Sequence, residues 1–237
     1  MTDIWKSTTK NLLFALCLTS ALLAVIHLVK IPIVIDKTMA FSILSTITGV
    51  GYILTIRNPE NYTGFYFGVI SSACLGVQMM LSGNLDQTFL YLAIFVPCQS
   101  SSLINWRKKY FTKKGDENFV PQFLKIKTQL IFLLIFIILT IADYVFMSKY
   151  LSLYNKEGFF SNFIIKIIFA IMVSSSILAN ILLIVKRMDC WIYWIIYSGL
   201  AVISAVIIKN NFNLLLFIFF LIINSLCFIS WLKLRKS

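Results

Sequence analysis

An amide followed by a tryptophan occurs twice in this sequence at the same spacing. Gln99 precedes Trp106 by seven positions, and Asn224 precedes Trp231 by seven positions. On a helix, residues seven positions apart share one face and lie about 10 Å apart along the axis. An amide in apolar surroundings needs hydrogen-bond partners. Two interpretations follow: a hydrogen bond between helices, or recognition of the hydroxyl or carboxamide groups of a ligand by fixed donors and acceptors.

A stripe of aromatic residues is the second candidate feature. Trp191, Trp194 and Tyr197 follow one another at intervals of three residues and therefore lie along one stripe of a helix. For Trp191, a place in an aromatic belt at the lipid headgroups is an alternative. Trp194 lies one turn deeper, where a flat heterocycle or a pyridinium cation would stack well on indole. We assign these three and Ser198 to a predicted substrate-binding set. Asn180 faces the same choice as the two repeated amides.

The composition predicts that a membrane surrounds these residues. Hydrophobic residues make up 59% of the chain, charged residues only 13%, and the mean hydropathy is +0.89. A soluble protein with this balance would expose large apolar patches and aggregate. Apolar runs long enough to cross a hydrocarbon core of about 30 Å occur at eight places. These are 11–29, 38–56, 62–81, 87–106, 128–147, 162–185, 190–208 and 213–231.

The eight runs predict an all-α, polytopic membrane protein. Hydrocarbon cannot satisfy free backbone N–H and C=O groups, so continuous apolar spans of this length must be helices. The first run has the basic start of a signal peptide, but Lys30 and Pro32 follow where a small-residue cleavage site would stand. We therefore expect a retained helix there.

The positions of the basic residues predict the orientation. Eight crossings put both termini on one side. Of the 21 lysines and arginines, 15 then lie on that side, 5 lie on the other, and Lys166 lies within a span. The larger set is Lys6, Lys10, Arg57, Arg107, Lys108, Lys109, Lys113, Lys114, Lys125, Lys127, Lys186, Arg187, Lys233, Arg235 and Lys236. Because cytoplasmic loops carry the excess of Lys and Arg, we expect cytoplasmic termini. This bias also explains the net charge of +12 without nucleic-acid binding.

The repeated pair predicts an internal duplication. Both copies end a helix at the cytoplasmic face, and each is the third helix of a triplet that begins outside. Two triplets with the same direction require one additional crossing between them, and parallel repeats of this kind are typical of transporters with a site near the membrane middle. The predicted organisation is an extra N-terminal helix (1–36), a first bundle (37–106), a basic cytoplasmic loop (107–127), a linker helix with an external loop (128–161), and a second bundle with a basic tail (162–237).

Three short motifs resemble the PnuC family of bacterial vitamin transporters. They are Pro97-Cys98-Gln99 leading to Trp106, Trp191-Ile192-Tyr193-Trp194-Ile195-Ile196, and Asn224 leading to Trp231. That family has SWEET-like architecture, with two three-helix bundles and a linker helix, and some members carry an additional N-terminal helix. The resemblance runs from Lys37 to the C-terminus, about five-sixths of the chain. The sequence departs from the family pattern at Ser102 and Cys227, where glycine is common, and at Ser198, where an acid or amide is common.

The resemblance implies facilitated uptake of nicotinamide riboside or a related vitamin or nucleoside across the bacterial inner membrane. Accumulation would be driven by phosphorylation of the substrate by a cytoplasmic kinase, and the family suggests a homotrimer. Two alternatives stay open from the residues. One is a substrate-binding component of a larger vitamin uptake complex, and the other is an integral membrane enzyme acting on lipids. Thiamine and riboflavin are alternative substrates.

The sequence lacks the residues that several kinds of chemistry require. The sequence has no phosphate-binding loop of the Gly-x-x-x-x-Gly-Lys-Ser/Thr type. His27 is the single histidine, and the five cysteines show no paired spacing, so neither a metal nor a cofactor is expected. The acids are dispersed along the chain instead of clustering as a metal-dependent lipid enzyme requires. We therefore expect no enzymatic activity.

Overall fold

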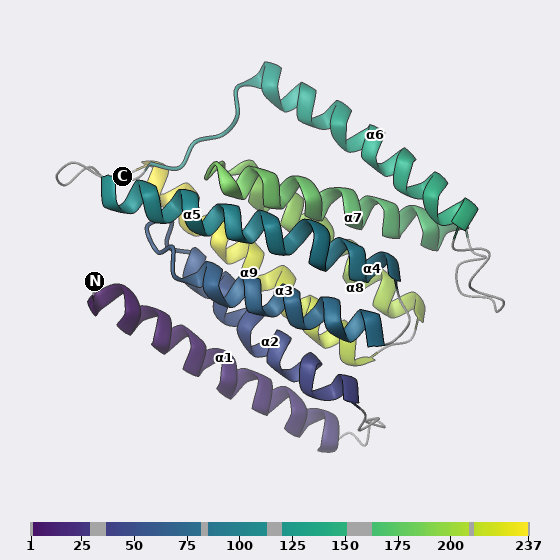
Figure 1. The fold of residues 1–237 in the computed structure, drawn as a ribbon, viewed down its shortest axis with the longest axis horizontal. Coiled ribbons are helices and arrows are strands. Elements are labelled where there is room, and N and C mark those ends of the chain that lie inside the picture. Colours follow the sequence, from purple (N-terminus) through teal and green to yellow (C-terminus); the bar gives the residue numbers. More distant parts are fainter. Residues whose placement is uncertain are drawn as a thin grey trace. The chain divides into compact units, whose positions relative to one another are not determined.

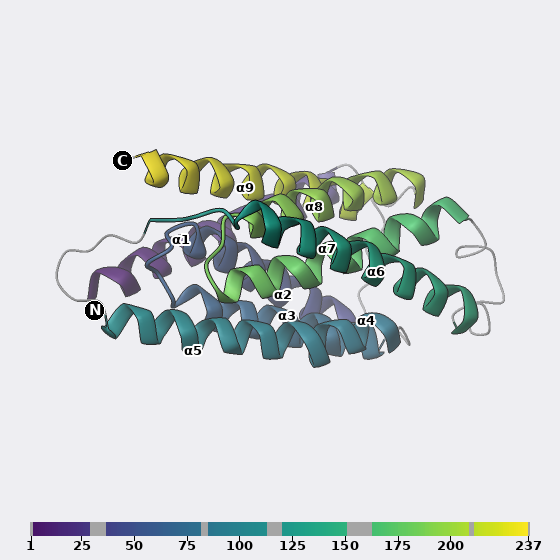
Figure 2. The ribbon, with the colours of Figure 1, turned by 90° about the horizontal axis from the view of Figure 1, so that it is seen from above.

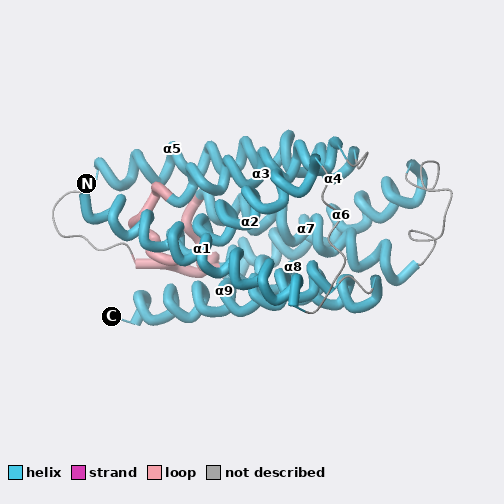
Figure 3. Tube along the Cα trace, turned by 90° about the horizontal axis from the view of Figure 1, so that it is seen from below, coloured by secondary structure: helices cyan, strands magenta, loops and turns pink. Residues whose placement is uncertain are grey.

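The computed structural model describes residues 2–28, 37–81, 85–112, 120–150, 163–208 and 211–236. These residues form helices joined by short loops, without a strand among them (Figures 1 and 3). The helices are α1 (Thr2–Leu28), α2 (Lys37–Ile56), α3 (Gly64–Leu81), α4 (Leu85–Phe89), the π-helical segment η1 (Leu90–Phe95), α5 (Val96–Thr112), α6 (Ile126–Tyr150), α7 (Phe163–Ile184), α8 (Asp189–Ile208) and α9 (Asn211–Lys236).

The all-α membrane architecture is confirmed. In the described part of the chain, six helices are long and apolar enough to cross a membrane by themselves: α2, α3, α6, α7, α8 and α9. The predicted fourth crossing is made of α4, η1 and α5, which run as one continuous rod (Figure 2). Together with α1, which has 27 residues, these give the eight helical segments expected from hydropathy. Helix α5 continues to Thr112, six residues beyond the predicted end of this span. Lys113, Lys114 and most of the predicted external loop, 151–161, lie outside the described residues.

Pro97 explains why the fourth rod is interrupted. Proline has no N–H to donate to the preceding turn, so the regular hydrogen-bond ladder cannot continue through it. Immediately before it, the N–H of Val96 donates to the carbonyl of Tyr91, five residues back, which is the π-helical pattern. A π-helical turn accommodates an extra residue and changes the phase of the helix that follows. Gln99 is therefore oriented by a local irregularity that hydropathy does not reveal.

The chain divides into two compact units, which we describe separately. Unit 1 comprises residues 1–121, 183–186 and 226–237, and unit 2 comprises 122–182 and 187–225. In unit 1, α1 and α3 each lie beside α2 (Figure 1). Small residues allow the close approach of α2 and α3: the hydroxyl of Ser71 on α3 donates to the carbonyl of Ser45 on α2 at 2.9 Å. A side chain at Gly49 would meet the Ser71 hydroxyl at 2.9 Å.

Unit 2 has its own apolar core and a peripheral helix. Ile168, Met172 and Ala201 form the buried centre, with Tyr197 and Phe217 packed against it. Helix α6 is different, because only 6% of its membrane-spanning window is buried although it has the highest mean hydropathy of the six spans, 2.7. A helix that is apolar all round and almost unburied is suited to contact with lipid chains.

Candidate functional site

Asn224 in unit 2 lies in a network of hydrogen bonds that joins α8 and α9. Its Nδ2 donates to the hydroxyl of Ser198 at 2.8 Å and to the carbonyl of Trp194 at 3.4 Å. The Ser198 hydroxyl in turn donates to the same Trp194 carbonyl at 2.8 Å. Because the hydroxyl proton is used in that bond, the serine oxygen must accept from Asn224, and this fixes the orientation of the amide. Both polar side chains are buried.

The aromatic residues of α8 occupy two different environments. Trp194 and Tyr197 are half-buried and pack edge to face, with ring centroids 5.6 Å apart and an interplanar angle of 88°. Trp191 has an exposed fraction of only 1%, so it lies inside the protein and not in a belt at the headgroups. The interpretation of Trp191 as a member of an aromatic belt at the lipid headgroups is therefore wrong. Trp194 remains the aromatic residue of this stripe with both an accessible face and a polar network beside it.

Gln99 in unit 1 lies in a corresponding environment. Its side chain is 3% exposed, and its Oε1 accepts a hydrogen bond of 2.9 Å from the hydroxyl of Ser72 on α3. Its Nε2 has no acceptor among the residues that the structure describes. Asn180, by contrast, donates to the carbonyl of Ser176 one turn earlier in its own helix, at 2.9 Å. The structure thus brings Asn224, Ser198 and Trp194 together, pairs Gln99 with Ser72, and leaves Asn180 bonded within α7.

The hydrogen bonds follow the duplication. In each triplet, an amide on the third helix bonds to a serine on the second helix: Gln99 to Ser72, and Asn224 to Ser198. Ser198 follows Ser72 by 126 residues, and Asn224 follows Gln99 by 125. The two predicted triplets therefore share the pairing of an amide with a serine, although the hydrogen bond runs in opposite directions in the two. Sequence reasoning missed Ser72 because it carries no signal by itself; it emerges only as the counterpart of Ser198.

The two repeated tryptophans have a structural role, and the indole hydrogen bonds that they donate lie within unit 1. Trp106, at the end of the first triplet, donates through Nε1 to the carbonyl of Leu183 in the last turn of α7, at 2.9 Å. Trp231, at the end of the second triplet, donates to the carbonyl of Arg57 just after α2, at 2.9 Å. Leu183 follows Arg57 by the same 126 residues. Each tryptophan thus satisfies a helix-terminal carbonyl of the other triplet.

Lys186 is a buried cation that sequence reasoning assigned only to the basic side. It is 5% exposed and has a φ of 58°, in the left-handed region. Its Nζ donates to the carbonyl of Pro59 at 2.8 Å and lies 4.3 Å from the centroid of the Trp106 ring. The lysine therefore joins the loop after α2 to the repeated tryptophan. A lysine beside an arginine between two apolar spans gave no sign of this role.

An aromatic residue of α2 was also missed, and the duplication could have revealed it. The counterpart of Trp194 in the first triplet, 126 residues earlier, is Gly68. The ring of Tyr52 covers this glycine: a Cβ added to Gly68 would lie 3.0 Å from Cδ2 of the ring. The counterpart of Tyr52 in the second triplet is Leu178. In the first triplet the aromatic ring is that of Tyr52, on the first helix. In the second triplet it is that of Trp194, on the second helix.

Comparison with known proteins agrees with this architecture. A solved structure described as the crystal structure of the vitamin B3 transporter PnuC superposes with a TM-score of 0.68 at 18% sequence identity, covering 97% of this chain and 92% of that chain. None of the curated proteins matches the chain. The described residues contain no group of three or more His, Cys, Asp or Glu side chains placed to hold a metal ion. A model of the nicotinamide mononucleotide transporter family matches residues 39–233. The chain therefore belongs to this family of membrane transporters.

Proposed function

We propose that this protein is a facilitator for nicotinamide riboside or a closely related vitamin or nucleoside. The observation that carries the proposal is the network of Trp194, Ser198 and Asn224, in which an accessible aromatic ring lies beside an amide of fixed orientation. Nicotinamide riboside offers the matching groups: a flat pyridinium ring, a carboxamide and ribose hydroxyls. The family to which the chain belongs and the name of the similar solved structure support the same substrate class.

The pyridinium ring binds to Trp194. An indole face attracts a cation through its quadrupole, with a contribution of up to about 2 kcal/mol when both groups are removed from water. Tyr197 holds the indole by its edge-to-face contact, so the ring is already in position before the substrate binds. A neutral, fully aliphatic solute gains nothing comparable from this surface.

The two repeated amides supply complementary hydrogen-bonding groups. Both hydrogens on Nδ2 of Asn224 are directed to protein acceptors, and its Oδ1 accepts none from the described residues, so it is available to a hydroxyl or carboxamide donor. Gln99 has the opposite arrangement, because its oxygen accepts from Ser72 and its Nε2 remains a donor. Each amide, within its own unit, discriminates against a substrate that leaves its acceptor or donor unpaired.

Transport direction and assembly complete the proposal. The positive charges on the predicted inner side support cytoplasmic termini in a bacterial inner membrane. A facilitator equilibrates its substrate, so net uptake requires a cytoplasmic kinase that converts the riboside into a charged phosphate ester. The resemblance to PnuC proteins supports a homotrimer, with the lipid bilayer as the surrounding partner.

Reconstitution of the purified chain tests this function. Liposomes containing the protein should take up labelled nicotinamide riboside to equilibrium without ATP or an ion gradient. In separate liposomes, a substrate kinase trapped together with ATP, its phosphoryl donor, should increase accumulation. Trp194→Ala should weaken substrate binding at least about tenfold, and Trp194→Phe should retain most of it. Tight binding without uptake would support a component of a larger complex, and product formation by the chain alone would support an enzyme. Either result would contradict the proposal.

A further inference from the structure

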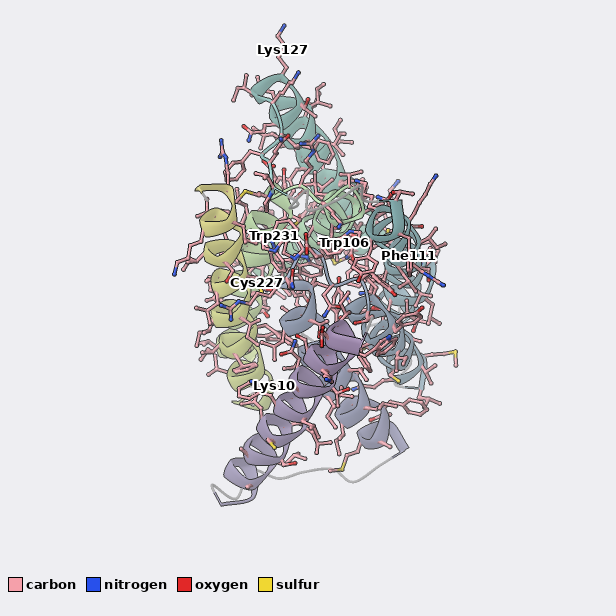
Figure 4. All side chains as sticks on the ribbon, turned by 90° about the vertical axis from the view of Figure 1, so that its left-hand side faces the viewer. Lys10, Trp106, Phe111, Lys127, Cys227 and Trp231 are labelled. Atoms are coloured by element: carbon pink, nitrogen blue, oxygen red, sulfur yellow. The ribbon has the colours of Figure 1, made fainter. Side chains whose placement is uncertain are left out.

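Unit 1 contains a polar pocket, and none of the predicted substrate-binding residues lines it. It has a volume of about 650 Å³ and lies between α1, the end of α2 and the end of α9. Ser7 and Asn11 line it from one face of α1. Figure 4 shows this helix in purple, with Lys10, the residue before Asn11, labelled. The pocket therefore exists because of the N-terminal helix, which lies outside the matched family region, 39–233.

The pocket is positively charged. Its lining includes two cations, Arg57 and Lys233, and no aspartate or glutamate. The remaining lining residues are the polar Ser7, Asn11, Thr55, Asn58 and Ser230 and the apolar Leu54 and Leu234. Asp3 is four residues before Ser7 on α1, but it pairs with Lys6 at 4.0 Å and is 94% exposed. The field inside the pocket is therefore set by the arginine and the lysine.

Arg57 is held in place in a way that leaves its terminal nitrogens available. Its Nε donates to the hydroxyl of Ser230 on α9 at 2.7 Å, and that hydroxyl donates to the carbonyl of Leu226 at 2.8 Å. Its backbone carbonyl is fixed by Trp231. Within the described part of the chain, the two terminal guanidinium nitrogens have no acceptor. A fixed guanidinium with two free nitrogens in one plane matches two oxygens of a phosphate group.

Lys233 lies one helical turn after Ser230, on the same face of α9. Its ammonium group has no acidic partner among the described residues. On the opposite wall, Asn11 gives one amide hydrogen to Thr55 at 3.4 Å and keeps a second, and the Ser7 hydroxyl makes no hydrogen bond to described residues. Donors therefore reach the pocket from α1, from the segment after α2 and from α9, and an anion with several acceptor oxygens can satisfy them together.

We propose that this pocket binds a phosphate group. Arg57 and Lys233 supply the charge, and Ser7, Asn11 and Asn58 supply neutral donors. The phosphate belongs either to an anionic phospholipid, whose glycerol and acyl chains would contact Leu54 and Leu234, or to a soluble phosphate compound that enters from the water. This site is independent of the proposed vitamin transport, because none of its residues takes part in the substrate network.

Binding and thermal unfolding of the full-length protein in detergent test the proposal. Phosphatidylglycerol is compared with zwitterionic phosphatidylcholine, and potassium phosphate with potassium chloride at equal ionic strength. We expect at least one phosphate source to raise the unfolding temperature of the wild type above its control. Arg57→Gln combined with Lys233→Gln should weaken the apparent affinity at least about tenfold. Stabilisation by the lipid alone, or by inorganic phosphate alone, identifies the source.

A matched control removes the same charge elsewhere. Lys108 and Lys109 are exposed on α5 and do not line the pocket, so Lys108→Gln with Lys109→Gln should bind phosphate as the wild type does. Lys233→Gln alone leaves the Arg57 hydrogen bond intact and carries the test if the double variant does not fold. The proposal is overturned if neither source stabilises the wild type, or if Lys233→Gln and the control variant bind equally well.

Discussion

Trp106 and Trp231, which end the two helix triplets, lie beside each other with ring centroids 6.1 Å apart and planes inclined by 40° (Figure 4). Both are completely buried. Each donates its indole N–H to a carbonyl at the end of the first helix of the other triplet. A spacing that repeats in the sequence thus becomes a reciprocal contact, and four chain segments from distant parts of the sequence are fixed at one place.

Removing either indole donor should destabilise the protein. Trp231→Phe leaves the partly buried Arg57 carbonyl without this partner, and Trp106→Phe does the same to the buried Leu183 carbonyl, at a cost of about 1–3 kcal/mol each. Thermal or denaturant unfolding in detergent measures the loss. Trp5→Phe is the control, because Trp5 is 43% exposed and its stacking on Tyr66 requires only a ring. Equal effects of all three substitutions would contradict the role of the indole N–H.

The Ser198 hydroxyl should matter for the substrate although it is buried. Ser198→Ala removes the acceptor that orients the Asn224 amide, so the affinity for substrate should fall about 2–10-fold, the loss of one neutral hydrogen bond. Binding to the purified protein measures this. Ser225→Ala is the matched control, since Ser225 is adjacent to Asn224 but bonds only to the Leu221 carbonyl of its own helix. An unchanged affinity in Ser198→Ala would show that the network does not hold the amide for a ligand.

Gly68 and Tyr52 should behave as a coupled pair. Gly68→Ala places a methyl group 3.0 Å from the Tyr52 ring and should cost about 1–3 kcal/mol through overpacking. Tyr52→Leu, which copies Leu178 of the second triplet, should recover part of this loss when the two are combined. Gly199→Ala is the control, because its new methyl meets nothing within 4 Å and alanine favours a helix. Simple additivity of Gly68→Ala and Tyr52→Leu would disprove the coupling.

Lys186 should stabilise the protein through its charged end. Lys186→Met keeps most of the aliphatic length but removes the hydrogen bond to Pro59 and the cation over the Trp106 ring. We expect a loss of at least about 2 kcal/mol in the free energy of unfolding. Lys108→Gln, on the exposed surface of α5, should change stability by less than about 0.5 kcal/mol. If the two substitutions had similar effects, the buried ammonium would contribute nothing specific.

The amino-acid sequence by itself determined the class of this protein. Continuous apolar runs are a local property, and a membrane allows them only one structure, so the all-α crossings followed from hydropathy alone. The spacing from Gln99 to Trp106, repeated at Asn224 and Trp231, predicted an internal duplication because a gene repeat preserves spacing. Bulk polarity and length were sufficient for the first inference, and the spacing of particular residues was sufficient for the second.

The tertiary structure decided which side chains meet. The partner of Gln99 is Ser72, the Trp191 ring is buried, and Lys186 enters the interior; none of these follows from the sequence of one helix. Such contacts depend on how each helix is rotated and how far it extends. A single π-helical turn before Pro97 changes that rotation for the rest of its helix, α5. Local patterns fix where helices form, and packing between distant segments fixes what each polar side chain does.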